Sequence, residues 1–500
     1  MAIPFSRVPN NIRAPLFYVE FDNSMANSAI ATQRTLIIGQ MLSTSTEKPN
    51  VPARISSAAQ AASLYGNGSL LHSMSSAYFA NDHAGETWVL PLSDADNMVA
   101  AKGSVKVSTP ATDTGVISLY IGGQRVQITT VATDKAEQVA TALSAAINQK
   151  AALPVTATVA FDSADAVTLT AKNKGASGNS IDLRLNYRGQ AGGEATPPGM
   201  DLKITPMAGG AGAPELKDAL SSLKDRSFDF IVNPYTDTAS LDDMKAFLSD
   251  NGGRWSWEQQ LYGHSFGAVG GTYGELATIG EQRNYQHETL FGVTKSPSPN
   301  YVWAAALTGA IAQSLRNDPG RPLQTLPISS VLAPASEDQL DLIERNNLLH
   351  SGISSFTVAD DSTVQVENVI TTYQKNSFGD NDDSYLQVET LYLLMYVTRY
   401  IRTQITSKFA RMKLVKNGTR FAPGSAIVTP NVIRAELIAQ YRSLEYNGYV
   451  QDSKSFAGGL IVEINAQNPN RVDVLWTGTL INQLRVFAVL NQFRLQPAAA

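Results

Sequence analysis

The stretch Thr35-Leu-Ile-Ile-Gly39 decides the class of fold. A continuous apolar run of this length, bounded by polar residues and glycine, is typical of a fully buried strand. Two helical patterns follow, near residues 56–65 and 70–81, and a second buried strand is expected at Thr87-Trp-Val-Leu-Pro-Leu92. Strands that alternate with helices form parallel sheets covered by those helices. This part of the chain therefore predicts an α/β body.

The composition changes at about residue 101 to Thr, Ser, Val and Gly. The expected elements are a short amphipathic helix at 136–147 and strands at 105–108, 115–121, 125–131, 156–161, 166–171 and 181–187. Gly- and Pro-rich stretches end this region, and the α/β alternation then resumes with a helix at 214–223 and a strand at 228–232. We expect a mostly-β insertion module, residues 101–208, within a discontinuous α/β body, residues 24–100 and 209–345.

A third unit is expected from residue 346 to residue 480. Its predicted elements are strands near 353–358 and 364–371, helices at 384–416 and 430–447, and a strand at 460–465. Terminal arms at residues 1–23 and 481–500 complete the organisation. The fold class is a multidomain α/β (α+β) protein.

Both arms contain apolar segments with the pattern of strands. In Leu16-Phe-Tyr-Val-Glu-Phe21 the residues Phe17, Val19 and Phe21 share one side of an extended chain. The last residues, Arg485 to Leu495, carry no acid and no turn that would fold them back. Their apolar positions are Val486, Phe487, Val489, Leu490 and Phe493. Chain ends are usually polar and frayed, so such segments need a partner.

The composition excludes several classes of function. The chain has 43% hydrophobic and 17% charged residues, a net charge of −5 and no cysteine. Disulfides, thiolate catalysis and cysteine metal sites are therefore absent, and direct nucleic-acid binding is not expected of an acidic chain. No apolar run is long enough to cross a bilayer. The five histidines show no i, i+3 or i, i+4 pair, so we expect no metal and no cofactor.

One motif suggests an enzyme. Gly263-His-Ser-Phe-Gly267 is a G-x-S-x-G sequence, in which Ser265 would be the nucleophile of an α/β hydrolase with His287 or His350 as its base. The preceding residues do not form a convincing strand, glycines stand where the helix should begin, and no HGGG-type segment precedes the motif. A serine hydrolase is therefore a distant alternative.

A run of cations interrupts the acidic chain between residues 399 and 420, with no acid among them. Its members are Arg399, Arg402, Lys408, Arg411, Lys413, Lys416 and Arg420. This run is either a solvated helix face or a docking strip for an acidic protein surface.

Four segments carry a family resemblance. They are Asn317 to Pro327, Val369-Ile-Thr-Thr-Tyr373, Asp383-Ser-Tyr-Leu386, and Asn470-Arg-Val-Asp-Val continuing to Phe493-Arg-Leu495. The chain resembles the tail sheath proteins of contractile-tailed phages, especially their Mu-like branch, and the resemblance is weakest in the insertion.

The resemblance implies a non-enzymatic structural subunit. Such subunits form hexameric rings stacked helically around an inner tail tube, and contract to drive the tube through the host envelope. It implies a virion location after assembly in the host cytoplasm, and tube, baseplate and tail terminator proteins as partners. The two arms would complete a sheet of neighbouring subunits, the insertion would face outward, and Arg399, Arg402, Lys408, Arg411 and Lys413 would contact the tube or a neighbour. The sheath of a related injection machine, such as an R-type pyocin, is an alternative.

Overall fold

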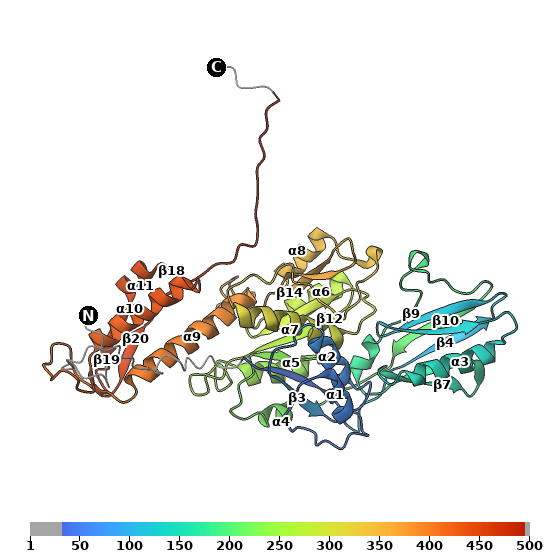
Figure 1. Ribbon diagram of the computed structural model, residues 1–500, viewed down its shortest axis with the longest axis horizontal. Helices are drawn as coiled ribbons and strands as arrows, with labels where there is room; N and C mark the ends of the chain where they lie inside the picture. The colour runs from blue at the N-terminus through green and yellow to red at the C-terminus, as the bar shows by residue number, and fades with distance from the viewer. Residues whose placement is uncertain (1–32, 496–500) are drawn as a thin grey trace, which may run out of the picture. The chain divides into compact units, whose positions relative to one another are not determined.

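The structure is a computed structural model that describes residues 33–495 (Figure 1). The described chain divides into two units: a body unit, residues 33–394 together with 482–495, and a C-terminal unit, Met395–Ile481. The predicted N-terminal strand with Phe17, Val19 and Phe21 lies outside the described residues.

The body unit is built on an eight-stranded sheet in the order β15-β14-β13-β12-β11-β1-β3-β2. Its strands are β1 Thr35–Gln40, β2 Ala53–Ile55, β3 Thr87–Leu92, β11 Phe230–Val232, β12 His264–Gly270, β13 Glu288–Val293, β14 Ile353–Val358 and β15 Val364–Asn368. The strands from β3 through β14 pair in parallel, whereas β2 and β15 are antiparallel at the two edges. The predicted α/β class of this unit is confirmed.

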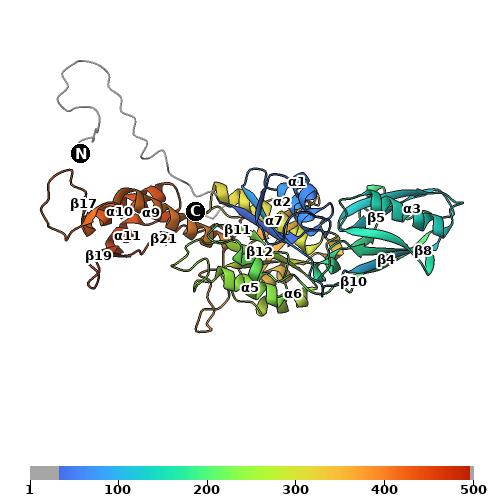
Figure 2. The ribbon, with the colours of Figure 1, turned by 90° about the horizontal axis from the view of Figure 1, so that it is seen from below.

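Helices cover both faces of this sheet (Figure 2). They are α1 Ala58–Tyr65, α2 Leu70–Phe79, α4 Lys217–Ser221, α5 Thr238–Leu248, α6 Tyr273–Glu281, α7 Asn300–Asn317, α8 Leu342–His350 and the 3-10 turn η3 Ser336–Asp338. Helices α2 and α7 pack together on one face, and α4, α5, α6 and α8 cover the other. Because both faces are covered, β1 and β13 are buried along their whole length, which explains their continuous apolar sequences.

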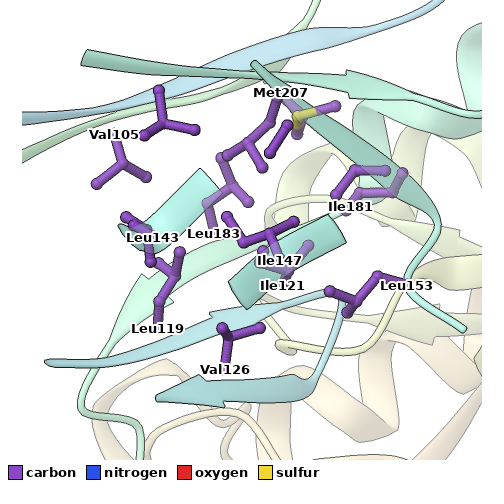
Figure 3. Close-up of a cluster of buried hydrophobic side chains, with 14 of the residues drawn as sticks. Val105, Leu119, Ile121, Val126, Leu143, Ile147, Leu153, Ile181, Leu183 and Met207 are labelled. Atoms are coloured by element: carbon purple, nitrogen blue, oxygen red, sulfur yellow. The ribbon is translucent and has the colours of Figure 1, made fainter. Parts of the chain in front are cut away.

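The insertion has its own hydrophobic core (Figure 3). Its elements are β4 Lys102–Thr109, β5 Gly115–Ile121, β6 Gln124–Thr130, α3 Ala136–Gln149, β7 Val155–Ala160, β8 Ser163–Ala171, η1 Ala176–Ser180, β9 Leu183–Leu185, η2 Gln190–Gly192 and β10 Asp201–Ala208. The strands form one sheet, β10-β4-β8-β7, and a second, β6-β5-β9. Leu143 and Ile147 of α3 fill the space between them. Strand β10, which the sequence did not predict, pairs with β4.

Buried polar contacts fix the insertion to the rest of the body unit. The side chain of Asn173 donates to the carbonyl of Met41 at 2.9 Å and to Asp94 at 3.1 Å, and accepts from the N–H of Leu70 at 2.9 Å. Gln40 donates to the carbonyl of Lys174 at 2.9 Å. Buried, fully used hydrogen-bonding groups favour one geometry, so the insertion and the sheet are held as one piece.

The C-terminal unit is mainly helical. Its elements are the larger part of α9 Val388–Phe409, α10 Pro430–Tyr446, α11 Ser453–Gly459, and the strands β16 Lys413–Leu414, β17 Ile427–Val428, β18 Val450–Gln451, β19 Ile461–Ile464, β20 Val472–Leu475 and β21 Thr479–Leu480. Helix α10 begins as predicted, with a Thr429 side chain accepting the N–H of Val432 and Pro430 in the first turn. Tyr441 and Phe456 stack at 3.8 Å between ring centroids in the core.

The predicted start of a third unit at residue 346 is wrong. Strand β14 pairs in parallel with β13 and β15 continues at the sheet edge, so both belong to the body unit. The division falls instead within helix α9, after Leu394. The helix predicted over 384–416 is also shorter than expected, since it spans Val388–Phe409.

A buried polar cluster joins three elements of the body sheet. Arg316, in the last turn of α7, contacts the carboxylate of Asp82 and donates to Thr35 Oγ1 of β1 at 2.7 Å. Tyr78 of α2 also contacts Asp82, which is 1% exposed. Despite its burial, hydrogen bonds from Tyr78 and Arg316 keep the pKa of Asp82 below its usual value.

We therefore expect Asp82→Asn to destabilise the protein by about 3 kcal/mol, because Arg316 would keep a buried charge without its partner. The measurement is urea unfolding followed by circular dichroism. The control is Asp165→Asn, which removes the partly exposed pair with Lys106 and should destabilise the protein much less. Equal effects of the two substitutions would contradict this assignment.

Candidate assembly surfaces

Ser265 does not lie on a nucleophile elbow. It is the second residue of β12, in register with Ile231 of β11 and Glu288 of β13, and is only 2% exposed. A catalytic serine of this type must stand at the exposed end of its strand. The whole motif after Gly263 is instead part of the strand, so the nucleophile assignment is wrong.

The two candidate bases also have other surroundings. The buried ring of His287 stacks on the ring of Trp255, with 4.1 Å between the ring centroids. Its Nε2 lies 3.1 Å from Asp250 Oδ1. Its neighbour His264 contacts Thr289 Oγ1 through Nε2 at 2.8 Å. His350 is the exposed last residue of α8. These histidines are structural parts of the sheet and its surroundings.

Within residues 33–495, no group of three His, Cys, Asp or Glu side chains has the arrangement of a metal site. In the same range, no helix combines the length and apolar character needed to span a bilayer.

The cationic run does not form one helix face. Arg399, Arg402 and Lys408 lie on α9, whereas Arg411 and Lys413 follow the helix. Lys408 is already paired with Glu436 of α10 at 2.6 Å. Arg402, Arg411 and Lys413 are exposed. A partner that recognises this region would therefore meet a helix flank and the adjoining loop.

The predicted C-terminal strand residues are exposed to an unusual degree. Residues 482–495 form no helix or strand in the described chain and are drawn as an extended trace in Figure 1. The exposed fractions are 80% for Val486, 82% for Phe487, 70% for Val489, 85% for Leu490 and 77% for Phe493. Contiguous exposed apolar residues of this kind mark interaction sites. We call residues 486–495 the C-terminal arm.

The C-terminal unit contains a hairpin, β19–β20, that sequence reasoning did not identify as a site. Ile461 pairs with Leu475 and Glu463 with Asp473, so these four side chains share one face. Ile461 is 51% and Leu475 55% exposed. In the part of the chain that the structure describes, no third strand joins either edge. The only sequence signal was two short apolar alternations, 461–464 and 472–475, which are too brief to distinguish from ordinary surface strands.

These features define a class of protein. Ser265 is a buried strand residue, and the apolar C-terminal arm is exposed where no described residue covers it. The arrangement favours a structural subunit over an enzyme.

Comparison with known proteins gives the family. The chain matches the phage tail sheath protein central domain over residues 209–372 and the phage tail sheath C-terminal domain over residues 380–494. It is 43% identical over 495 residues to a Mu-like prophage FluMu tail sheath protein of Haemophilus influenzae, covering 99% of this chain and 100% of that protein. The chain belongs to the phage tail sheath protein family. It is thus a structural, non-enzymatic sheath protein of a contractile tail, as the sequence resemblance implied.

Solved structures resemble the chain at lower similarity. A sheath tail protein from Desulfitobacterium hafniense has a TM-score of 0.46 at 13% identity, covering 94% of this chain and 100% of that one. A sheath tail protein from Listeria innocua has a TM-score of 0.47 at 14% identity, covering 90% and 92%. The contracted sheath complex of an extracellular contractile injection system has a TM-score of 0.48 at 12% identity, covering 97% and 98%.

The buried imidazoles predict how stability depends on pH. Burial lowers the pKa of His287 below its usual value, although the hydrogen bond and charge of Asp250 oppose this shift. Burial lowers the pKa of His264 well below its usual value. The unfolded chain therefore binds more protons than the folded chain below the ordinary histidine pKa of about 6.5. We expect the free energy of unfolding to fall by about 1 kcal/mol or more between about pH 7.5 and about pH 5.5.

Urea unfolding at the two pH values measures this change. His287→Gln should reduce the pH dependence, whereas His350→Gln at the exposed end of α8 should leave it as in the parent protein. The account of the buried histidines fails if His287→Gln retains the full dependence.

Proposed function

We propose that this sheath protein assembles by strand exchange between identical subunits. The single observation that carries the proposal is the exposed apolar C-terminal arm. In the proposal the arm adds a strand to the β19–β20 hairpin of a neighbouring copy, so that copies are linked into hexameric rings stacked helically around an inner tail tube.

The hairpin is a suitable acceptor for an added strand. A two-stranded sheet is only marginally stable unless more strands or a helix support it, and α10 packs on one face of this one. A third strand would satisfy free backbone groups at about 0.5–1.5 kcal/mol net per hydrogen bond. It would also bury apolar side chains at about 25 cal/mol per Å².

Charge favours the arm as the incoming strand. Glu463 and Asp473 face each other on the outer side of the hairpin, and like charges in this position repel. Arg471 lies 2.5 Å from Asp473 and offsets part of that charge. The arm carries Arg494 and no acid, so it adds positive charge beside an acidic face.

The N-terminal arm is proposed as the second added strand. The hairpin has two edges, and the residues Phe17, Val19 and Phe21 have the alternation that suits one of them. These residues lie outside the described range. One strand at each edge would link each hairpin to two further chains.

Contraction needs two kinds of contact. The exchanged strands would hold copies together throughout, while polar surfaces of the body units exchange partners as subunits rotate. The extended sheath is then a metastable state, and new contacts between body units release free energy without nucleotide hydrolysis. The contracting sheath would drive the tube through the host envelope. The same mechanism would operate in a phage tail or in a related injection machine such as an R-type pyocin.

The remaining surfaces have proposed roles. Arg402, Arg411 and Lys413 contact the tube or a neighbour, with Arg399 and Lys408 beside them. The insertion, residues 101–208, faces outward and moves with the body sheet to which Asn173 fixes it. Baseplate and tail terminator proteins bind the ends of the sheath. Assembly takes place in the host cytoplasm and the product is part of the virion.

Deleting residues 486–500 should leave a folded monomer that forms no long polymers, because the exchanged strand is lost. Sedimentation and electron microscopy of the purified protein measure this. Deleting only residues 496–500 is the matched control and should retain polymerisation. Normal tubes without residues 486–500 would overturn strand exchange by the C-terminal arm.

The double substitution Arg402→Glu and Arg411→Glu should reduce sheath assembly on purified tubes by about tenfold or more, because charge complementarity orients the contact. The double substitution Lys102→Glu and Lys203→Glu, at exposed positions of β4 and β10, is the control for an equal change of charge. Unimpaired assembly of the double variant would remove these residues from the proposed contact.

A further inference from the structure

The change from anchored to free chain occurs between Arg485 and Val486. Arg485 Nη2 lies 2.5 Å from Glu389 Oε1, and the Arg485 side chain is 17% exposed. The next residue, Val486, is 80% exposed, and residues 487–495 form no helix or strand. Arg485 is thus the last residue of the C-terminal segment that is held by its own body unit.

Glu389 is placed to receive this side chain. It is fully buried in the first turn of α9, where the helix dipole favours a carboxylate. Its Oε1 also accepts the backbone N–H of Leu323 at 2.9 Å. The next residue in that loop, Gln324, donates its side-chain N–H to the carbonyl of Leu484 at 3.3 Å. The first turn of α9 and the 323–324 loop therefore form the site that binds residues 484–485.

A buried carboxylate is costly unless a charge or hydrogen bonds compensate it. Glu389 has one backbone donor and one cation, and that cation comes from the end of the chain rather than from a neighbouring helix. The ion pair thus connects the α9 carboxylate to the root of an otherwise exposed arm.

We infer that the Glu389–Arg485 ion pair is the anchor of the C-terminal arm, fixing where the exchanged strand leaves its own subunit. The inference rests on the strand exchange proposed above. The arm beyond the anchor, residues 486–495, then spans about 33 Å as an extended strand. A force that a neighbouring subunit exerts on the strand is transmitted through Arg485 to α9 and the body unit.

Without the ion pair, residues 482–485 keep the exposed contact of Gln324 with the carbonyl of Leu484 at 3.3 Å. If that exposed contact also opens, the last fixed point of the chain is Ile481, whose N–H donates to the carbonyl of Tyr449 at 3.3 Å. That contact belongs to the C-terminal unit. The free segment would then start four residues earlier and would be tethered to a different unit. A longer, less ordered root lowers the effective concentration of the strand at its acceptor, and it no longer couples the strand to the body unit.

The test compares three single variants of the full chain. Arg485→Gln and Glu389→Gln remove the ion pair, whereas Arg485→Lys keeps a cation. Lys can replace Arg here because the contact uses a single nitrogen. The measurement is the critical concentration for polymerisation, by sedimentation. We expect both glutamine variants to raise it about tenfold or more and Arg485→Lys to stay within about twofold of the parent.

Hydrogen exchange of the unassembled protein gives a second measurement. Residues 482–485 should lose protection in Arg485→Gln while the strands of the body sheet keep theirs. If Glu389→Gln fails to fold, Arg485→Gln decides, because Arg485 lies outside every helix and strand. A purely structural pair would change the unfolding free energy and leave the critical concentration unaltered.

The outcomes separate this inference from the proposed function. If deletion of residues 486–500 abolishes polymers but both glutamine variants polymerise like the parent, the anchor is overturned and strand exchange stands. If the deletion itself has no effect on polymerisation, strand exchange by the C-terminal arm is overturned, and the inference that rests on it is overturned too.

Discussion

The central physical constraint is that an extended backbone needs partners for its N–H and C=O groups, and an apolar strand also needs a surface to cover its side chains. Residues 486–495 have neither among the described residues. Their composition would be a liability in a monomer, since exposed apolar strands aggregate. In an assembly subunit the same property supplies a specific link, provided that the acceptor edge is short and correctly placed. The hairpin β19–β20, with four residues per strand, has the short edge that this link requires.

The rest of the molecule provides rigid parts for such links to act on. The body sheet is covered by helices on both faces, and the cluster of Arg316, Asp82, Tyr78 and Thr35 joins α7, α2 and β1 within it. Asn173 fixes the insertion to the rest of the body unit through two buried hydrogen bonds and one partly buried hydrogen bond. Packed interiors of this kind transmit displacement without deforming. In the proposed mechanism, change during contraction would fall on the surfaces between subunits and on the points where the arms leave them.

Sequence patterns were sufficient where the signal is local. Strands β1 and β3 were predicted almost to the residue, because a strand buried on both faces must be apolar throughout, and Pro430 marked the start of α10. The strand β14 was predicted but assigned to a separate unit, since a strand that extends a sheet edge looks the same as one that starts a new domain. The Gly263–Gly267 motif was misleading because its meaning depends on the end of the strand at which Ser265 lies. The Glu389–Arg485 pair joins residues far apart in the chain, and no local pattern could reveal it.

If the C-terminal arm of one copy pairs with the hairpin of another, disulfide trapping should join the two copies covalently. The chain has no cysteine, so the pair Val489→Cys and Leu475→Cys would supply the only thiols. Polymers assembled under reducing conditions and then oxidised should give a ladder of covalent oligomers on a denaturing gel, absent from either single-cysteine variant. Further cysteine pairs along the two strands would cover other registers of pairing. If the polymers are intact but every pair gives only monomers on the gel, either without a disulfide or with one inside a single chain, strand exchange between copies is contradicted.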